Sequence, residues 1–174
     1  KEKEEGELSE AFWNASLPQS LDTSVASSPY FNVFLASQVK ANDKGFLSKD
    51  VLVSDLVSLR GDIHHLFPRD FLKKNGLERG KYNQIANYVY MQSEINIKVG
   101  NKPPKDYFAL IHQQMAEDNR LVSGLSTEQE LLDNLKASCI PAEIITMGID
   151  DYNDFLIARR KLMALKIKEY YFSL

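Results

Sequence analysis

The sequence predicts an α+β fold that is mostly helical and carries one small β-hairpin near the middle of the chain. Three observations support this prediction. Apolar residues make up 44% of the 174 residues, which suffices for the core of one domain. In most segments these apolar residues recur at helical spacing. Two short, strongly apolar runs, at residues 63–67 and 88–91, instead have the composition of strands.

Helices are expected on both sides of this hairpin and within its connection. Apolar spacing, caps and turn residues predict them at residues 8–15, 30–41, 51–59, 69–75, 93–99, 105–118, 127–138 and 151–172. The first should end before Pro18, and the Ser- and Thr-rich residues 17–28 should form a loop. Residues 51–59 are ambiguous because their Val and Leu content also suits a strand, and a helical turn is favoured. Ser93 is expected to cap the helix at 93–99.

The chain is expected to form a single domain with three parts. N-terminal helices occupy residues 1–60, a core with the hairpin and the next helix occupies residues 61–100, and C-terminal helices occupy residues 105–174. The first five residues are all charged and the first is Lys1, so we expect a fragment of a longer protein.

Neither secretion nor membrane insertion is indicated by the sequence. It contains no signal peptide and no apolar run that approaches the roughly 18 residues of a membrane helix. The single cysteine, Cys139, excludes an internal disulfide and a Cys-rich zinc site. A reducing, cytoplasmic location is therefore expected.

Charge is distributed unevenly along the chain. Residues 60–105 contain nine basic and four acidic residues, a net charge of +5. The remainder therefore carries −8, although the formal charge of the whole chain is only −3. Such a split suggests an anionic partner for the middle segment. An ordinary solvated surface would explain the charges alone equally well.

Two of the three histidines stand next to each other at the end of the first apolar run, in the sequence Asp62-Ile63-His64-His65-Leu66-Phe67-Pro68. By itself, a His-His pair is more often one packed and one exposed imidazole than a functional site. The second run changes this interpretation. Asn87 precedes it, Asn96 follows nine positions later inside the next predicted helix, and Lys98 comes two residues after that. Asn is a poor residue for a helix interior, so the combination indicates a function.

Together, these residues resemble the HNH, or ββα-metal, family of nucleases. The resemblance is closest to the C-terminal nuclease domain of GmrSD-type modification-dependent restriction enzymes, and it covers most of the chain, including Phe12-Trp13 and Phe46-Leu47-Ser48. It implies a ββα-metal hairpin-plus-helix embedded in a helical domain. It also implies a metal-dependent DNA endonuclease, belonging to a restriction or phage-defence protein, that cuts or nicks phosphodiester bonds.

The resemblance also implies a role for each residue of the pattern. His65 stands at the position of the general base, which takes a proton from the attacking water. His64 and the amide oxygen of Asn96 stand at the positions of metal ligands. Asn87 stands where the family uses an Asn to hold the loop and orient the base. Asp62 is either a further residue that orients an imidazole or a turn residue.

The metal and the partners follow from the same resemblance. Many members of the family carry Asp where this chain has His64, and imidazole suits Mn²⁺ or Ni²⁺ better than Mg²⁺, so the identity of the divalent metal stays open. DNA is the expected partner, with Lys98, Lys102 and Lys105 on its phosphates. An N-terminal NTP-using sensor domain is expected elsewhere in the protein, because this sequence has no Gly-rich phosphate loop. Homo-oligomerisation is left open.

Other charged residues are interpreted as ordinary surface. His112 is expected to lie on the surface of its helix, and Arg159-Arg160-Lys161 to be the solvated face of the last helix. Two alternative functions stay open. One is a catalytically silent DNA-binding or oligomerisation module on an HNH scaffold, and the other is an RNase, since the base and metal chemistry does not select the sugar.

Overall fold

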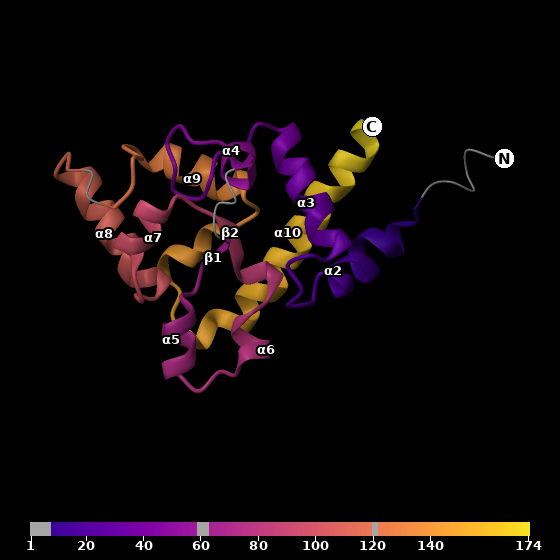
Figure 1. Cartoon of the computed structure of the whole chain (residues 1–174), viewed down its shortest axis with the longest axis horizontal. Helices are drawn as coiled ribbons and strands as arrows, with labels where there is room; N and C mark the ends of the chain where they lie inside the picture. Colours follow the sequence, from indigo (N-terminus) through magenta and orange to yellow (C-terminus); the bar gives the residue numbers. More distant parts are fainter. Residues whose placement is uncertain (1–7, 59–62, 120–121) are drawn as a thin grey trace.

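Helices make up most of the structure, and one sheet of two strands lies among them (Figure 1). This computed structural model describes residues 8–58, 63–119 and 122–174. Their elements are, in order, η1 (Phe12–Ser16), α2 (Leu17–Ser20), α3 (Pro29–Lys40), α4 (Val53–Ser58), β1 (Ile63–His65), α5 (Arg69–Lys74), α6 (Arg79–Tyr82), η2 (Ile85–Asn87), β2 (Tyr88–Tyr90), α7 (Ser93–Val99), α8 (Pro104–Ala116), α9 (Glu128–Ala137), η3 (Ala142–Thr146), η4 (Ile149–Asp151) and α10 (Tyr152–Ser173). The predicted class, a mostly helical α+β fold with one small antiparallel sheet, is confirmed.

The sheet pairs β1 with β2 in antiparallel orientation at the centre of the molecule, with α5 and α6 below it in Figure 1. Its register places His65 directly opposite Tyr88. Just beyond the strands, the backbone N–H of Leu66 donates to the carbonyl oxygen of Asn87 at 2.8 Å. Strand pairing therefore brings the histidine pair next to Asn87, although α5 and α6 separate them in sequence.

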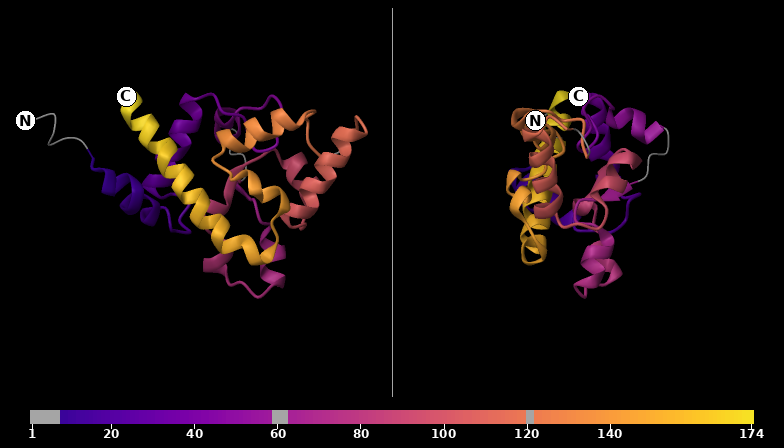
Figure 2. Two further views of the ribbon diagram at one scale, coloured as in Figure 1. Left: turned by 180° about the vertical axis from the view of Figure 1, so that it is seen from behind. Right: turned by 90° about the vertical axis from the view of Figure 1, so that its left-hand side faces the viewer.

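The long helix α10 runs diagonally across the back of the molecule (Figure 2). It contacts η1, α2 and α3 from the N-terminal part of the chain. Its residue Phe155 packs against Phe67, which follows β1, with ring centroids 5.0 Å apart. Buried apolar residues from Trp13 to Ile167 form one core cluster, so the hairpin and the helices at both ends of the described chain share a core. Among the described residues, no helix has the length and apolar character needed to cross a bilayer.

The prediction that a helix ends before Pro18 is wrong. A π-helical turn at Phe12–Ser16 leads directly into α2 at Leu17–Ser20. Pro18 lies in the first turn of α2, directly after this wider turn, in which the N–H of Leu17 donates to Phe12 five residues back. Its missing N–H therefore falls where the hydrogen-bond pattern changes, and the helix continues through it. The predicted loop at residues 17–28 therefore begins only after α2.

The remaining helices lie close to their predicted positions. The ambiguous segment 51–59 contains α4, so the favoured helical turn is confirmed. Gly76 has a φ of 85°, which suits its predicted place just beyond the end of α5. Ser93 is not the N-cap predicted for α7, because it is the first helical residue and Gln92 holds the cap position without a side-chain bond. The four-residue helix α6 was not predicted.

The run Arg159-Arg160-Lys161 does not form a solvated face, contrary to the prediction. Arg159 is only 1% exposed. Arg160 is partly buried and pairs with the carboxylate of Asp22 at 3.2 Å, and only Lys161 is exposed. Helical spacing did not predict this burial, because the two arginines lie on the side of α10 that faces β2 and the loop before it.

Candidate functional site

A pocket of about 260 Å³ opens beside β1 and the end of α7. Its lining contains three of the residues that the sequence predicts to form a site, namely His64, His65 and Asn96. The rest of the lining is Ile63, Pro68, Arg69, Asp70, Gly100 and Asn101. Residues more than 30 positions apart in the sequence thus meet in one polar concavity.

Local structure explains how each side chain reaches the pocket. The two histidines end β1, and Pro68 lies just beyond, directly before α5, where its fixed φ suits the turn. Asn96 lies inside α7, which ends at Gly100 with a φ of 60°, a conformation that favours glycine. Because Gly100 and Asn101 also line the pocket, the chain bends there at the pocket wall.

Asn87 does not line the pocket and is fully buried. Its side-chain oxygen accepts from the N–H of Phe67 at 2.8 Å. Its amide nitrogen donates to the carbonyl oxygens of Phe67 at 3.1 Å and of Tyr82 at 3.2 Å. One side chain therefore ties together the segment after the histidine pair and the segment before β2.

His65 is half-buried and has a partner that was not predicted from the sequence. Its Nε2 lies 2.9 Å from Oδ1 of Asn83, and its ring packs edge-on against Tyr88 with centroids 5.3 Å apart. A carbonyl oxygen only accepts hydrogen bonds, so with the Asn83 amide placed this way His65 carries its proton on Nε2 and Nδ1 keeps its lone pair. Burial lowers the pKa of His65 below 6.5, the nearby charge of Arg69 also lowers it, and the bond to Asn83 opposes this shift.

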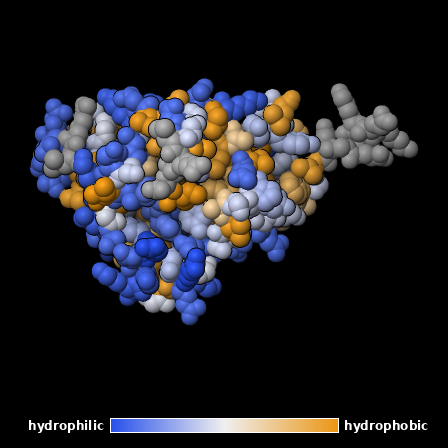
Figure 3. Space-filling view, viewed as in Figure 1, coloured by the Kyte–Doolittle hydropathy of each residue, from blue (hydrophilic) through white to orange (hydrophobic). Residues whose placement is uncertain are grey.

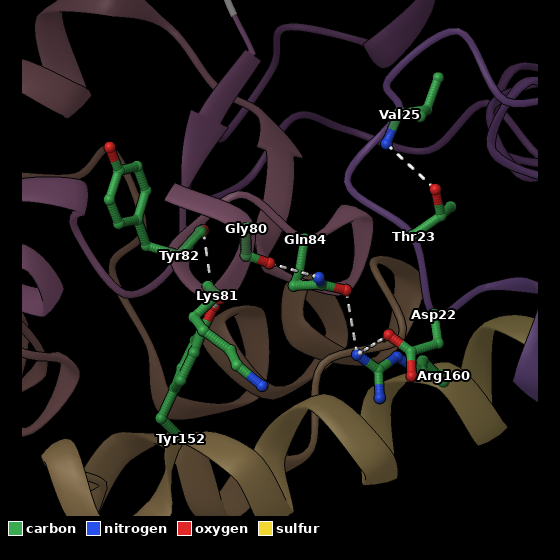
Figure 4. A network of polar contacts seen from close by, with 9 residues as sticks. All are labelled: Asp22, Thr23, Val25, Gly80, Lys81, Tyr82, Gln84, Tyr152 and Arg160. Atoms are coloured by element: carbon green, nitrogen blue, oxygen red, sulfur yellow. Dashed lines mark hydrogen bonds and ion pairs between the residues drawn. The ribbon is translucent and has the colours of Figure 1, made fainter. Parts of the chain in front are cut away.

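The segment that carries Asn83 is held in place by α10 (Figure 4). The hydroxyl of Tyr152 donates to the carbonyl oxygen of Lys81 at 2.7 Å, and the guanidinium of Arg160 donates to the side-chain oxygen of Gln84 at 3.1 Å. Lys81 and Gln84, which flank Tyr82 and Asn83 in the sequence, are thus both bonded to α10. No local sequence signal marks Asn83, since it stands in a polar loop between two ordinary residues.

His64 and Asn96 line the same pocket, and their side chains carry imidazole nitrogens and an amide oxygen. Both groups are ordinary ligands of divalent first-row metals. No group of three or more His, Cys, Asp or Glu that could hold a metal occurs in the part of the chain that the structure describes. The predicted metal site therefore consists, within that part, of these two neutral donors. Asp62, the further candidate, lies outside the described residues.

Exposed basic residues follow the pocket-lining residues of both α5 and α7 along the chain. Arg69 opens α5 at the pocket wall, and it is followed on α5 and α6 by further exposed basic residues, namely Lys73, Lys74, Arg79 and Lys81. The surface over these two helices is predominantly hydrophilic (Figure 3). Beyond Asn96, the predicted phosphate-binding residues Lys98, Lys102 and Lys105 are all exposed.

Two other features lie away from this pocket. His112 pairs with Glu128 at 2.7 Å, partly exposed, as expected of a surface histidine. A larger groove of about 1110 Å³ runs between α9 and α10, but its lining is mostly apolar and includes none of the predicted site residues. The smaller pocket is the better candidate because it combines an imidazole of lowered pKa with amide and guanidinium groups.

Comparisons with family models, with curated proteins and with solved structures gave no significant match to this chain.

Proposed function

We propose that this chain is a metal-dependent DNA endonuclease domain of the HNH type. The observation that carries the proposal is the meeting of His64, His65 and Asn96 in one pocket, with Asn87 bonded to Phe67, two residues after His65. The pocket is bordered by a strand pair and the helix that follows it, and this arrangement supports the resemblance seen in the sequence.

His65 is the proposed general base. Its lowered pKa keeps the imidazole uncharged at neutral pH, as a proton acceptor must be. The contact with Asn83 leaves Nδ1 as the basic nitrogen. His65 Nδ1 would take the proton of the water that attacks phosphorus, while Asn83 holds the ring in one orientation.

His64 and Asn96 are the proposed ligands of a divalent metal. Such a metal, when bound, would polarise the scissile phosphate and stabilise the leaving oxygen. Both ligands are neutral, so they would leave most coordination positions to phosphate oxygens and water. Arg69, which lines the pocket and pairs with Asp70 at 3.6 Å, would contribute a positive charge for the same phosphate.

DNA is the proposed substrate because exposed basic residues follow the pocket-lining residues of α5 and of α7 along the chain, on α5 and α6 and at Lys98, Lys102 and Lys105. By the same resemblance, we propose that the domain acts in the cytoplasm within a restriction or phage-defence protein. An NTP-using sensor domain of that protein would select the DNA.

A plasmid-nicking assay tests the proposal. Supercoiled DNA is incubated with the protein and Mg²⁺, Mn²⁺ or Ni²⁺, with EDTA as control and a single-stranded RNA as a second substrate. We expect nicked or linear plasmid in at least one metal and none in EDTA. Plasmid binding without cleavage in any metal would favour the silent module, and cleavage of RNA alone would replace the DNase by an RNase.

A further inference from the structure

Arg159 is a fully buried cation that bonds only to backbone carbonyl oxygens in the described structure. Its Nη1 donates to Ala86 at 2.9 Å and to Tyr88 at 2.6 Å, and its Nη2 donates to Ser138 at 3.2 Å. The side chain is 1% exposed. None of the salt bridges among the described residues includes it.

The carbonyl of Tyr88 needs such a donor because of the strand register. The N–H of Leu66 donates across to the carbonyl oxygen of Asn87, so His65 and Tyr88, one step further, occupy the non-hydrogen-bonded position of the ladder. The N–H and C=O groups of Tyr88 therefore point away from β1, toward the outer edge of the sheet. Arg159 lies at that edge and satisfies the outward carbonyl.

Ala86 and Tyr88 are the two neighbours of Asn87. Arg159 bonds to both of their carbonyls through one nitrogen, and so fixes the backbone on each side of Asn87. Asn87 in turn bonds to the backbone of Phe67, two residues after His65. A continuous series of hydrogen bonds thus runs from α10, through β2, to the segment that carries the proposed base.

Packing alone does not require a cation at this position. Burial lowers the pKa of Arg159 to about 10, since the charged form loses its hydration. An apolar side chain of similar size would fill the space without that penalty. A guanidinium, unlike an apolar group or an ammonium, presents several donors in a planar fork, which matches carbonyls on two different segments.

We propose that Arg159 is a positioning residue of this site, which holds Asn87 and thereby the His65 segment in the geometry needed for cleavage. The proposal rests on the nuclease function proposed above. Replacing a residue that hydrogen-bonds to a metal ligand typically lowers metal affinity or activity by roughly 10–100-fold, and we expect a loss of that order here.

Two variants and a matched control test the proposal. Arg159→Lys keeps the charge but not the fork, and Arg159→Met keeps the length without donors. Gln114→Met removes another buried amide, which bonds to Val122 and Ser123 and does not line the pocket. Steady-state cleavage of supercoiled plasmid with Mn²⁺ gives kcat and KM for each protein, corrected for its folded fraction, and native-state hydrogen exchange follows individual amides.

We expect kcat to fall by roughly 10–100-fold for both Arg159 variants, with KM within about threefold of wild type. Gln114→Met should keep the kcat of wild type per folded molecule. The amides of Leu66 and Phe67, which bond to Asn87, should exchange faster in Arg159→Lys, whereas that of Leu47, which bonds to Asn134, should not change.

Three results would overturn the proposal: wild-type kcat in Arg159→Lys, unchanged exchange at Leu66 and Phe67, or failure of both Arg159 variants to fold while Gln114→Met folds. The last would make the role of Arg159 structural. A wild-type protein that does not cleave would instead contradict the proposed nuclease function, and the exchange measurement would still decide whether Arg159 holds the Asn87 segment.

Discussion

Asn87 and Phe67 are joined by two hydrogen bonds between the side-chain amide of the first and the backbone of the second, at 2.8 Å and 3.1 Å. Both residues are fully buried. The backbone carbonyl of Asn87 also accepts from the N–H of Leu66 at 2.8 Å. The segment after the histidine pair is therefore fixed to the segment before β2 from two sides.

Replacing Asn87 by Ala should destabilise the protein strongly. The change leaves the N–H of Phe67 and two carbonyls without their partners in a buried environment, at about 1–3 kcal/mol for each unsatisfied group. Urea unfolding measures the loss. Asn75→Ala is the control, since the amide of Asn75 is exposed and bonds to a single carbonyl. Equal stability of the two variants would contradict the role of Asn87 as an anchor.

His65→Ala should abolish cleavage while DNA binding and stability stay nearly unchanged. Loss of a general base typically lowers the rate on the order of 10²–10⁴-fold. His112→Ala is the matched control, because His112 pairs with Glu128 away from the pocket and should keep wild-type activity. A His65→Ala protein that cuts plasmid at the wild-type rate would remove His65 from the mechanism.

The rate of cleavage should fall on the acid side of the pH profile, with an apparent pKa below 6.5. Burial disfavours the charged imidazole of His65 and the charge of Arg69 acts in the same direction, so the active neutral form persists to lower pH than in a free histidine. A bound metal beside it would shift the apparent pKa the same way.

Asn83→Asp should shift the acid limb of the same pH profile in the opposite direction. A carboxylate beside Nε2 of His65 favours the charged ring, so the acid limb should move to higher pH. Asn75→Asp, in an exposed position on another turn, should leave the limb unchanged. If Asn83→Asp also leaves it in place, the group that titrates in cleavage is not His65.

Lys98, Lys102 and Lys105 are predicted to bind phosphates of the DNA backbone. Replacing all three by Ala should weaken binding to every DNA sequence and reduce the salt slope of the affinity by about 0.9 for each phosphate contact that is lost. Fluorescence anisotropy over a salt series measures the slope. The control is a triple Ala variant of the exposed Lys49, Lys136 and Lys161. Equal slopes for the two triple variants would assign the predicted lysines to ordinary surface.

Exchange of one ligand should change the preferred metal. With His64 as a ligand, cleavage should be faster in Mn²⁺ or Ni²⁺ than in Mg²⁺, and His64→Asp should shift the preference toward Mg²⁺ because a carboxylate suits this harder ion. The measurement is the cleavage rate in each metal for both proteins, with His112→Asp as the control. The same metal profile before and after the His64 substitution would show that this residue does not bind the catalytic ion.

Local features of the fold were predictable because local forces set them. Apolar spacing marked α3, α8 and α10, and turn residues such as Gly76 marked where helices end. The predicted helix end before Pro18 was wrong because the rule that proline ends a helix depends on the hydrogen bonds of the neighbouring turn. Pro18 does not stop the helix, because it falls where the π-helical turn passes into α2 and the hydrogen-bond pattern changes.

The sequence by itself determined the helical class, the two strands and the set of His64, His65, Asn87 and Asn96, since periodicity and motif spacing are properties of the chain. Only the tertiary structure decided that Asn83 is the partner of His65 and that Arg159 is buried against β2. Each of these contacts joins segments far apart in sequence. Their partners are selected by how α10 packs across the sheet, and no local pattern of residues encodes that packing.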